Sequence, residues 1–414
     1  MKIKLIFPNA FVPKQILFLL IVLLAAGCQK ASALPENALP QTPPAGNPQT
    51  IVRATTSPTP TATATAAATP TPTATFTPTA TIAVFGPSEY PGYINPLTGK
   101  EVSDPELLDR PPVMVKVSNF PREGRPHAGL SFADIVFDYY IGEGTNRLLA
   151  LYYGQNAPKV GPIRSARLVD AQLATLYQGI LVYAGADYNR VSPVIYRELG
   201  NRAFTNSNAT CPALCDDGPH TVFSVFADTG LFSDYARGII GSFHHKPDFR
   251  GMYFSSARPG LGLPADQVTI RYNAYNLSQW SFDSVAQSYL VSMENVDQYN
   301  NLIMVPLTDR LTGEKLSFSN LIVVFAKYNE FAPTLHDIEL WYNNKGNRAV
   351  LFRDGEAIEA QWKTAQTDLP IEFLTIDQQP LPLKPGNSWI AIMGLNSTVQ
   401  QTSQGQWEVQ FSLP

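Results

Sequence analysis

The segment GPIRSAR (Gly161 to Arg167) places two arginines, Arg164 and Arg167, on either side of Ser165. Apolar residues recur at helical spacing after it, which predicts a helix from Arg164 to Tyr177 with these three residues in its first turn. The first turn is the positive end of the helix dipole, where two cations are unfavourable unless something negative holds them. The segment therefore requires a negative partner, which is either a ligand or carboxylates of the same chain.

Two interpretations of these arginines remain open. In the first they form an anion site, because guanidinium groups and free N–H groups at a helix start bind phosphate or carboxylate. In the second, Asp134, Glu143 and Asp170 neutralise them inside the protein, with Arg167 pairing with Asp170 three residues further on. Buried charges must be paired and the motifs supply both signs in similar numbers, which favours the second interpretation. The candidate residues of this site are Arg125, Asp134, Glu143, Arg147, Arg164, Ser165 and Arg167.

The start of the chain has the features of a secretory signal. Lysines precede the apolar run ILFLLIVLL, which is short for a membrane-spanning helix, and the small residues of AAGC end at Cys28. This cysteine resembles that of a bacterial lipobox, which implies removal of residues 1–27 as a lipoprotein signal peptide and a lipid on Cys28. The alternative is an ordinary signal peptide or anchor helix in which the cysteine is incidental.

Residues 28–85 are rich in proline, threonine and alanine and carry almost no charge, so they bury too little apolar surface to fold. We expect a disordered tether between the lipid and a folded body. The chain has 30 Lys and Arg against 34 Asp and Glu, a net charge of −4, which argues against a nucleic-acid-binding protein. The part after the tether is long enough for two domains.

Once Cys28 is lipidated, the remaining cysteines are Cys211 and Cys215 in the segment CPALCDD. Outside the cytoplasm, two cysteines this close in sequence are expected to form a local disulfide. The alternative is a zinc site to which His220 and either His244 or His245 would be added, but the C-x-x-x-C spacing is not typical of zinc sites. We therefore predict a disulfide, no metal site and no cofactor.

The folded part divides into two regions by its pattern of elements. Short runs rich in Val, Ile and Tyr predict strands in residues 86–263, around the helix described above. Residues 264–414 show strand-like runs at short intervals and little helical pattern, after the Gly/Pro-rich boundary RPGLGLPAD. The predicted fold class is α+β: a mixed α/β layered N-terminal domain followed by a mainly antiparallel β C-terminal domain. Three tryptophans are expected in the core or on a sheet face, with a sugar-stacking surface as the alternative: Trp341, Trp362 and Trp389.

Several segments resemble the YerB-like bacterial lipoproteins. In the first region these are NPLTG, RPHAGLSFADIV, EGTNRLLALY and GPIRSAR, and in the second LTGEKLSFSNLIVVF, FRDGEAIEAQWK and LPLKPGNSWIAIM. The resemblance implies a two-domain α/β lipoprotein on the outer face of the membrane, and it implies no particular reaction. The chain departs from the family in the turn Glu143 to Arg147. It also departs at Pro306–Leu307, where the family often has a histidine after the proline.

These features favour a membrane-anchored extracytoplasmic lipoprotein that acts as a binding or scaffold module of the cell envelope. Its expected partners are the membrane, through the N-terminal lipid, and an envelope protein or cell-wall component. An enzyme is less favoured, because the sequence has no Gly-x-Ser-x-Gly elbow, no His-Glu-x-x-His and no P-loop, and no catalytic residue is identified. Two alternatives stay open: an envelope enzyme that acts on wall polymer with the arginine and acid residues, and a solute-binding lipoprotein.

Overall fold

The computed structural model describes residues 82–206, 210–241, 246–260 and 262–413. These residues belong to one compact unit. The expected signal peptide, Cys28 and nearly all of the tether lie outside the described residues, as does the His244–His245 pair. Among the described helices, none has the length and apolar character that crossing a membrane requires.

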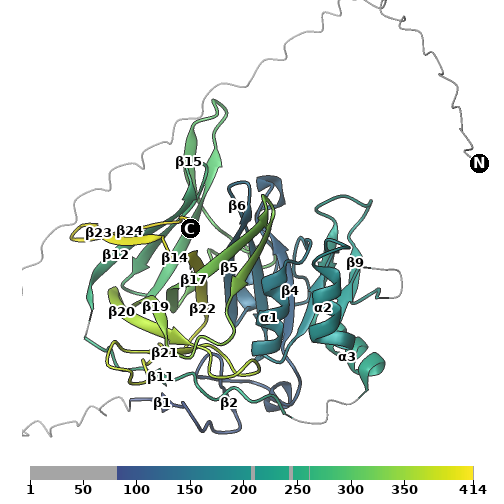
Figure 1. Ribbon diagram of the computed structural model, residues 1–414, viewed down its shortest axis with the longest axis horizontal. Helices are drawn as coiled ribbons and strands as arrows, with labels where there is room; N and C mark the ends of the chain where they lie inside the picture. The colour runs from purple at the N-terminus through teal and green to yellow at the C-terminus, as the bar shows by residue number, and fades with distance from the viewer. Residues whose placement is uncertain (1–81, 207–209, 242–245, 261, 414) are drawn as a thin grey trace, which may run out of the picture. The chain divides into compact units, whose positions relative to one another are not determined.

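Most of the described strands join in one extended sheet, and its central section contains strands from both halves of the chain (Figure 1). The strand order in this section is β8-β7-β4-β6-β5-β22-β17-β19-β20-β21. The bounds are β4 Val113–Ser118, β5 Ile135–Gly142, β6 Thr145–Tyr152, β7 Ile180–Tyr183, β8 Ala203–Thr205, β17 Asn320–Ala332, β19 Asn347–Arg353, β20 Glu356–Lys363, β21 Glu372–Leu374 and β22 Ser388–Gly394.

A second section of the sheet is built from the C-terminal half alone, in the order β23-β24-β12-β13-β14-β15. The bounds are β12 Leu263–Asn273, β13 Asn276–Asp283, β14 Ser288–Val296, β15 Leu302–Pro306, β16 Ser317–Phe318, β18 Leu335–Glu339, β23 Thr398–Ser403 and β24 Gly405–Gln410. Strand β16 pairs with β14, and β18 forms a hairpin with the end of β17. Three short pairs complete the strands: β1 Val84–Phe85 with β11 Phe254–Ser255, β2 Ile94–Asn95 with β3 Lys100–Glu101, and β9 Leu214–Asp216 with β10 Val225–Ala227.

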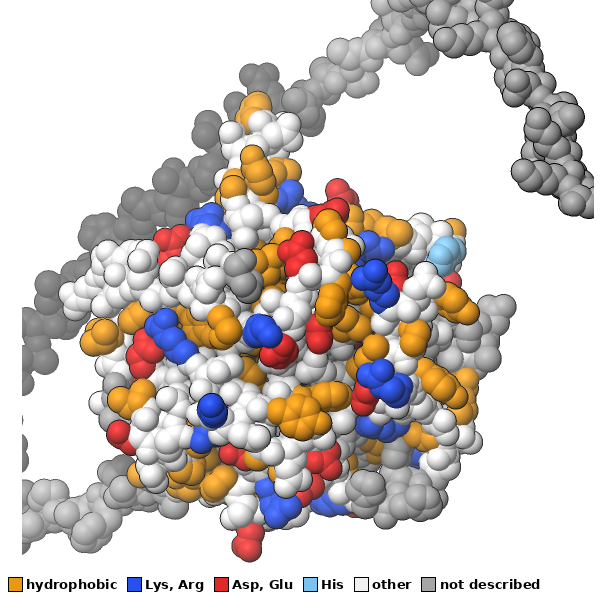
Figure 2. Space-filling model, viewed as in Figure 1, with side chains coloured by type: hydrophobic (Ala, Val, Ile, Leu, Met, Phe, Trp, Pro, Cys, Tyr) orange, Lys and Arg blue, Asp and Glu red, His pale blue; other side chains and the backbone are white. Residues whose placement is uncertain are grey.

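The described chain is mostly β, with α-helices only between residues 168 and 240. They are α1 (Leu168–Leu176), α2 (Ser192–Leu199) and α3 (Thr229–Ile240), and they lie alongside β4, β7 and β8 (Figure 1). From β12 onward the described residues form strands and turns, as the sequence pattern predicts. Charged side chains of both signs are interspersed over the face that Figure 2 shows, in agreement with the small net charge.

The predicted start of α1 was wrong by one turn. The helix begins at Leu168, with Arg167 as its N-cap in an extended conformation. The backbone of Arg164 instead bonds to strands: its N–H donates to Lys116 O (2.9 Å) and its carbonyl accepts from Ala184 N (3.1 Å). In a helix that began at Arg164 its carbonyl would accept the N–H four residues further on, but here it accepts that of Ala184, just after β7, so Arg164 and Ser165 lie outside the helix.

The two halves of the chain meet where β5 pairs in parallel with β22, from Ile135 beside Ser388 to Tyr139 beside Ile392. Strand β22 is buried along its whole length and has β17 as its other neighbour. The predicted boundary after residue 263 falls inside β12, whose first two residues pair with β20. Separate folding of residues 86–263 and 264–414 therefore stays a prediction, and the sheet itself is continuous across them.

A buried carboxyl group lies at this junction. Asp138 on β5 is 1% exposed, and Asn146 Nδ2 donates a hydrogen bond to it. Burial raises the pKa of Asp138 from 3.8 to about 7, although Asn146, Tyr272 and Trp389 oppose the shift. Between about pH 4 and pH 7, Asp138 is therefore protonated in the folded protein and ionised in the unfolded chain.

We predict that Asp138 makes the unfolding free energy fall as the pH rises from about 4 to about 7, by at most about 1.4 kcal/mol per pH unit. Asp138→Asn keeps the shape and removes the titration. The unfolding free energy of the wild type minus that of the variant, measured by urea denaturation across this range, should therefore fall steadily as the pH rises. Asp234→Asn, at an exposed surface position, serves as the control. Parallel pH profiles for wild type and Asp138→Asn would contradict the assignment.

Candidate functional site

Three of the predicted arginines come together beside the start of α1, and we call Arg147, Arg164 and Arg167 the arginine cluster. Arg147 projects from β6, Arg164 from the extended segment before the helix, and Arg167 from the N-cap. The carbonyl of Ser165 accepts hydrogen bonds from Nη1 of Arg147 (3.2 Å) and Nη1 of Arg167 (3.5 Å). Arg167 Nη1 also donates to the carbonyl of Ala166 (3.0 Å). The contact that Ser165 makes with the cluster therefore comes from its backbone.

The arginine cluster has no carboxylate within ion-pair distance among the described residues. The Nε atoms of all three arginines are buried and lack a hydrogen-bond partner in the described structure. Burial, followed by repulsion from Arg167 and Arg164, lowers the pKa of Arg147 to about 9. Burial and then Arg167 also lower the pKa of Arg164. Three like charges are thus held together with no ion pair among the described residues, and Asp170 and Tyr139 offset only part of the shift at Arg147. Arg164 and Arg167 remain half-exposed.

The carboxylate expected to neutralise Arg167 is used elsewhere. Asp170 is fully buried, and its Oδ1 lies 3.2 Å from Nζ of Lys116 and contacts the hydroxyl of Tyr139. Its Oδ2 accepts the backbone N–H of Arg167 (2.6 Å). The predicted side-chain pair between Arg167 and Asp170 is therefore wrong. Asp170 caps the helix and compensates Lys116, whose pKa burial lowers to about 7 against the opposing effect of Asp170.

The two other predicted acids do not reach the cluster. Asp134 is buried and accepts hydrogen bonds from Asn95 Nδ2 (3.0 Å) and from the backbone N–H groups of Tyr153 (2.5 Å) and Gly154 (3.0 Å). Burial is the main reason that its pKa rises to about 6. Glu143 is exposed in the β5–β6 turn, at a positive φ of 50°. Asp134 therefore stabilises a loop, and Glu143 contributes its backbone to a turn.

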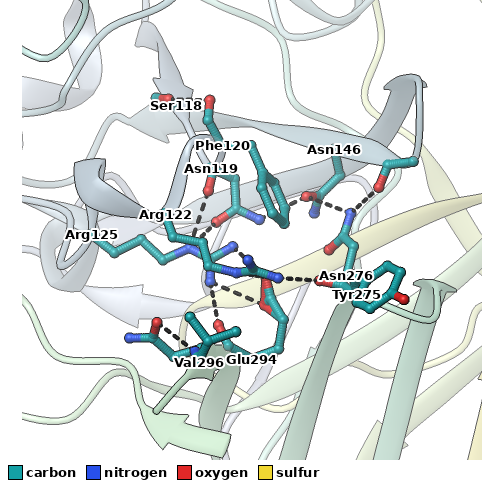
Figure 3. A network of polar contacts seen from close by, with 12 residues as sticks. Ser118, Asn119, Phe120, Arg122, Arg125, Asn146, Tyr275, Asn276, Glu294 and Val296 are labelled. Atoms are coloured by element: carbon teal, nitrogen blue, oxygen red, sulfur yellow. Dashed lines mark hydrogen bonds and ion pairs between the residues drawn. The ribbon is translucent and has the colours of Figure 1, made fainter. Parts of the chain in front are cut away.

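Arg125 lies in a different network, which joins the two halves of the chain (Figure 3). Its guanidinium forms two parallel contacts of 3.1 Å with the carboxylate of Glu294 on β14. Arg122 adds a contact of 3.4 Å to the same carboxylate and donates to Tyr275 O (2.7 Å). Glu294 is 1% exposed, so the pair is buried and compensated. The internal-network interpretation thus describes Arg125, but with a partner more than 160 residues away in sequence.

Cys211 and Cys215 form a disulfide, as the sequence predicts. His220 lies beside them in sequence but contacts Asp216, with 2.9 Å between Nδ1 and Oδ1. No group of three His, Cys, Asp or Glu side chains suited to hold a metal ion occurs among the described residues.

Comparisons with known proteins agree with the resemblance seen in the sequence. Residues 97–211 match the N-terminal domain, and residues 268–390 the C-terminal domain, of the family described as "Protein of unknown function (DUF3048)". The chain belongs to this family. It is 28% identical over 316 residues to "Putative lipoprotein YerB" of Bacillus subtilis (strain 168), which covers 72% of this chain and 85% of that protein. The crystal structure of the Bacillus subtilis YerB protein superimposes with a TM-score of 0.58 and 26% identity, over 72% of this chain and 96% of that chain.

Two buried charges that sequence reasoning missed belong to these networks. Lys116 is the one charged residue in the strand VMVKVS, and Glu294 is the charged residue within the buried part of β14. A single charge in a buried strand needs a partner, so the sequence could have predicted that each of these residues forms a buried ion pair. The identity of the partner was not accessible, because Asp170 and Arg125 are distant in sequence.

The buried pair of Lys116 and Asp170 predicts where truncation is most costly. Asp170→Ala leaves Lys116 without a counter-charge and removes the helix cap, so we expect a loss of roughly 3–5 kcal/mol in unfolding free energy. The loss should be larger at pH 6 than at pH 9, because Lys116, with a pKa of about 7, is largely neutral at the higher pH. Chemical denaturation at both values measures it.

Two control variants make this prediction specific. Asp234→Ala removes an exposed carboxylate and should change the unfolding free energy by less than about 1 kcal/mol. Arg167→Ala leaves no carboxylate unpaired and should also have a small effect. A loss at Arg167→Ala as large as that at Asp170→Ala would contradict this assignment, because it would indicate an ion pair between the side chains of Arg167 and Asp170.

Proposed function

We propose that this protein is a membrane-anchored extracytoplasmic binding module of the cell envelope, whose α/β N-terminal part captures an anionic group through the arginine cluster. The single observation that supports this is that the guanidinium groups of Arg147, Arg164 and Arg167 gather without an ion pair to any carboxylate among the described residues. A protein that only needed these residues for stability gains nothing from three adjacent cations that lack an ion-pair partner among the described residues. A bound phosphate or carboxylate removes their repulsion and accepts hydrogen bonds from the half-exposed guanidinium groups of Arg164 and Arg167.

The partner that fits is an envelope protein or cell-wall component that carries an exposed phosphate or carboxylate. Planar guanidinium groups bind such anions with two parallel hydrogen bonds, which gives orientation as well as affinity. The half-exposed Arg164 and Arg167 are within reach of a group on another molecule, whereas Arg147 is more deeply buried. The relative named as a putative lipoprotein supports an anchored position outside the cytoplasm.

An enzyme that uses the same region is the second candidate, because Lys116 has a pKa of about 7 next to the cluster. The side chains of Lys116, Tyr139 and Asp170 are however fully buried. A catalytic group must touch its substrate, whereas these three groups contact one another. The accessible part of the site is the arginine cluster, and this favours binding over catalysis.

The anion site predicts a stabilising effect of phosphate. Added at constant ionic strength, inorganic phosphate should raise the melting temperature of the wild type by mass action. Arg164→Gln and Arg167→Gln should keep or slightly raise the melting temperature without phosphate, because each removes a repulsive charge. Both should lose most of the phosphate effect. Arg348→Gln, at an exposed position on β19, should respond to phosphate as the wild type does. Equal phosphate responses in all four proteins would exclude the cluster as the anion site.

The anchored position predicts a role for Cys28. Cys28→Ala removes the acceptor of the lipid, so the protein should leave the detergent-rich phase in which membrane lipoproteins partition. Cys211→Ala/Cys215→Ala, which keeps Cys28, is the control and should partition as the wild type. Unchanged partitioning of Cys28→Ala would mean that the apolar N-terminal segment anchors the chain without a lipid.

A further inference from the structure

A cavity of about 760 Å³ lies between the helices α1 and α2 on one side and the β17–β18 hairpin with the turn after it on the other. This volume is in the range of small-molecule sites, which often form where two parts of a chain meet. The cavity lies outside the networks of Arg125 and Asp134 described above. Its lining residues include Gln172, Arg190, Phe331, Asp337, Trp341 and Tyr342.

Aromatic rings are presented along one side of this cavity. Phe331 is 57% and Tyr342 is 75% exposed, although apolar rings of this size are ordinarily buried. Trp341 is partly exposed, and its indole Nε1 donates to the carbonyl of Gln172 (3.3 Å). The other two tryptophans considered in the sequence, Trp362 and Trp389, are fully buried in the core. Only Trp341 of the three is therefore available to a ligand.

Polar groups with fixed positions lie beside these rings. Gln172 Nε2 donates to Asp337 Oδ1 (2.9 Å), and Gln172 Oε1 accepts the backbone N–H of Leu340 (3.0 Å). Glu339 is held by Lys327 (2.8 Å), and the exposed guanidinium of Arg190 makes no hydrogen bond or ion pair in the described structure. The ionisable lining residues are two arginines and two carboxylates, so the cavity has both signs and no net charge.

We propose that this cavity binds an uncharged segment of a carbohydrate chain. Sugar rings have apolar C–H faces that pack on exposed aromatic rings, and hydroxyl groups that both donate to carboxylates and accept from guanidinium and amide groups. An aliphatic lipid would desolvate four ionisable groups without hydrogen-bonding to them. A phosphate would be repelled by the carboxylates of Asp337 and Glu339. The inference is independent of the arginine cluster, because no residue of that cluster lines the cavity.

Two substitutions remove the aromatic surface with little effect on the fold. Phe331→Ala truncates an exposed ring near the end of β17. Tyr342→Asn is preferable to alanine, because Tyr342 has a φ of 62° and asparagine tolerates this left-handed conformation. Tyr299→Ala is the matched control, since Tyr299 is 74% exposed on the separate β14–β15 hairpin.

The test is isothermal titration with two neutral probes, the tetrasaccharides of N-acetylglucosamine and of β-1,4-linked glucose, against the full folded region. At least one probe should bind the wild type and the Tyr299→Ala variant equally. Its affinity should fall at least about tenfold for Phe331→Ala and for Tyr342→Asn. A melting temperature within the range of the control shows that the loss comes from the site. The phosphate response of the arginine cluster should be unchanged in both variants, which separates this proposal from the proposed function.

Three results would overturn the proposal. The first is absence of binding of both tetrasaccharides to the wild type at millimolar concentration. The second is binding that Phe331→Ala and Tyr342→Asn leave intact. The third is preferential binding of a synthetic peptide with the proline- and threonine-rich sequence of residues 56–75, because aromatic grooves also bind extended proline-rich peptides.

Discussion

The parallel pairing of β5 with β22 is the interaction on which the remaining structure depends. Strand β5 pairs with β6, which carries Arg147, and β22 pairs with β17, which leads into the β18 hairpin. This one register therefore sets the position of the arginine cluster relative to the cavity beside α1. Parallel pairing requires long connections, and here the partners are about 250 residues apart. The C-terminal strands thus complete the sheet that the N-terminal strands begin.

Charges in this protein fall into two kinds of environment. In the first, a buried charge has an oppositely charged partner. Glu294 forms two parallel contacts with Arg125, and Lys116 forms an ion pair with Asp170. Desolvation makes an unpaired charge in such a position costly, so these pairs are required once the residues are buried. In the second, the arginine cluster has no ion pair among the described residues, with Arg147 buried and Arg164 and Arg167 half-exposed. The burial of Lys116 explains the difference: it takes the carboxylate of Asp170, which the sequence places closest to Arg167.

Much of the fold follows from the sequence, because its strands are short apolar runs between turn residues and its helix α1 has a regular apolar spacing. The helix start was misplaced because spacing cannot show that Arg164 bonds to Lys116 and Ala184 through its backbone. The same limit applies to the site. Arginine, aspartate and glutamate were the correct residue types, but their pairing depends on which strands become neighbours. Glu294, on β14, is a partner that no local pattern connects to Arg125.

Helix α1 links the two candidate sites. Arg167 is its N-cap, and Leu168, Ala171 and Gln172 on the same helix line the cavity. The position of this helix is fixed at its start by Asp170, which accepts the Arg167 N–H and contacts Lys116 on β4. The Lys116–Asp170 pair therefore supports the helix on which the N-cap Arg167 and part of the cavity lining lie. Because the pair is fully buried and cannot contact a ligand itself, its role is to hold both ligand-facing surfaces against the same sheet.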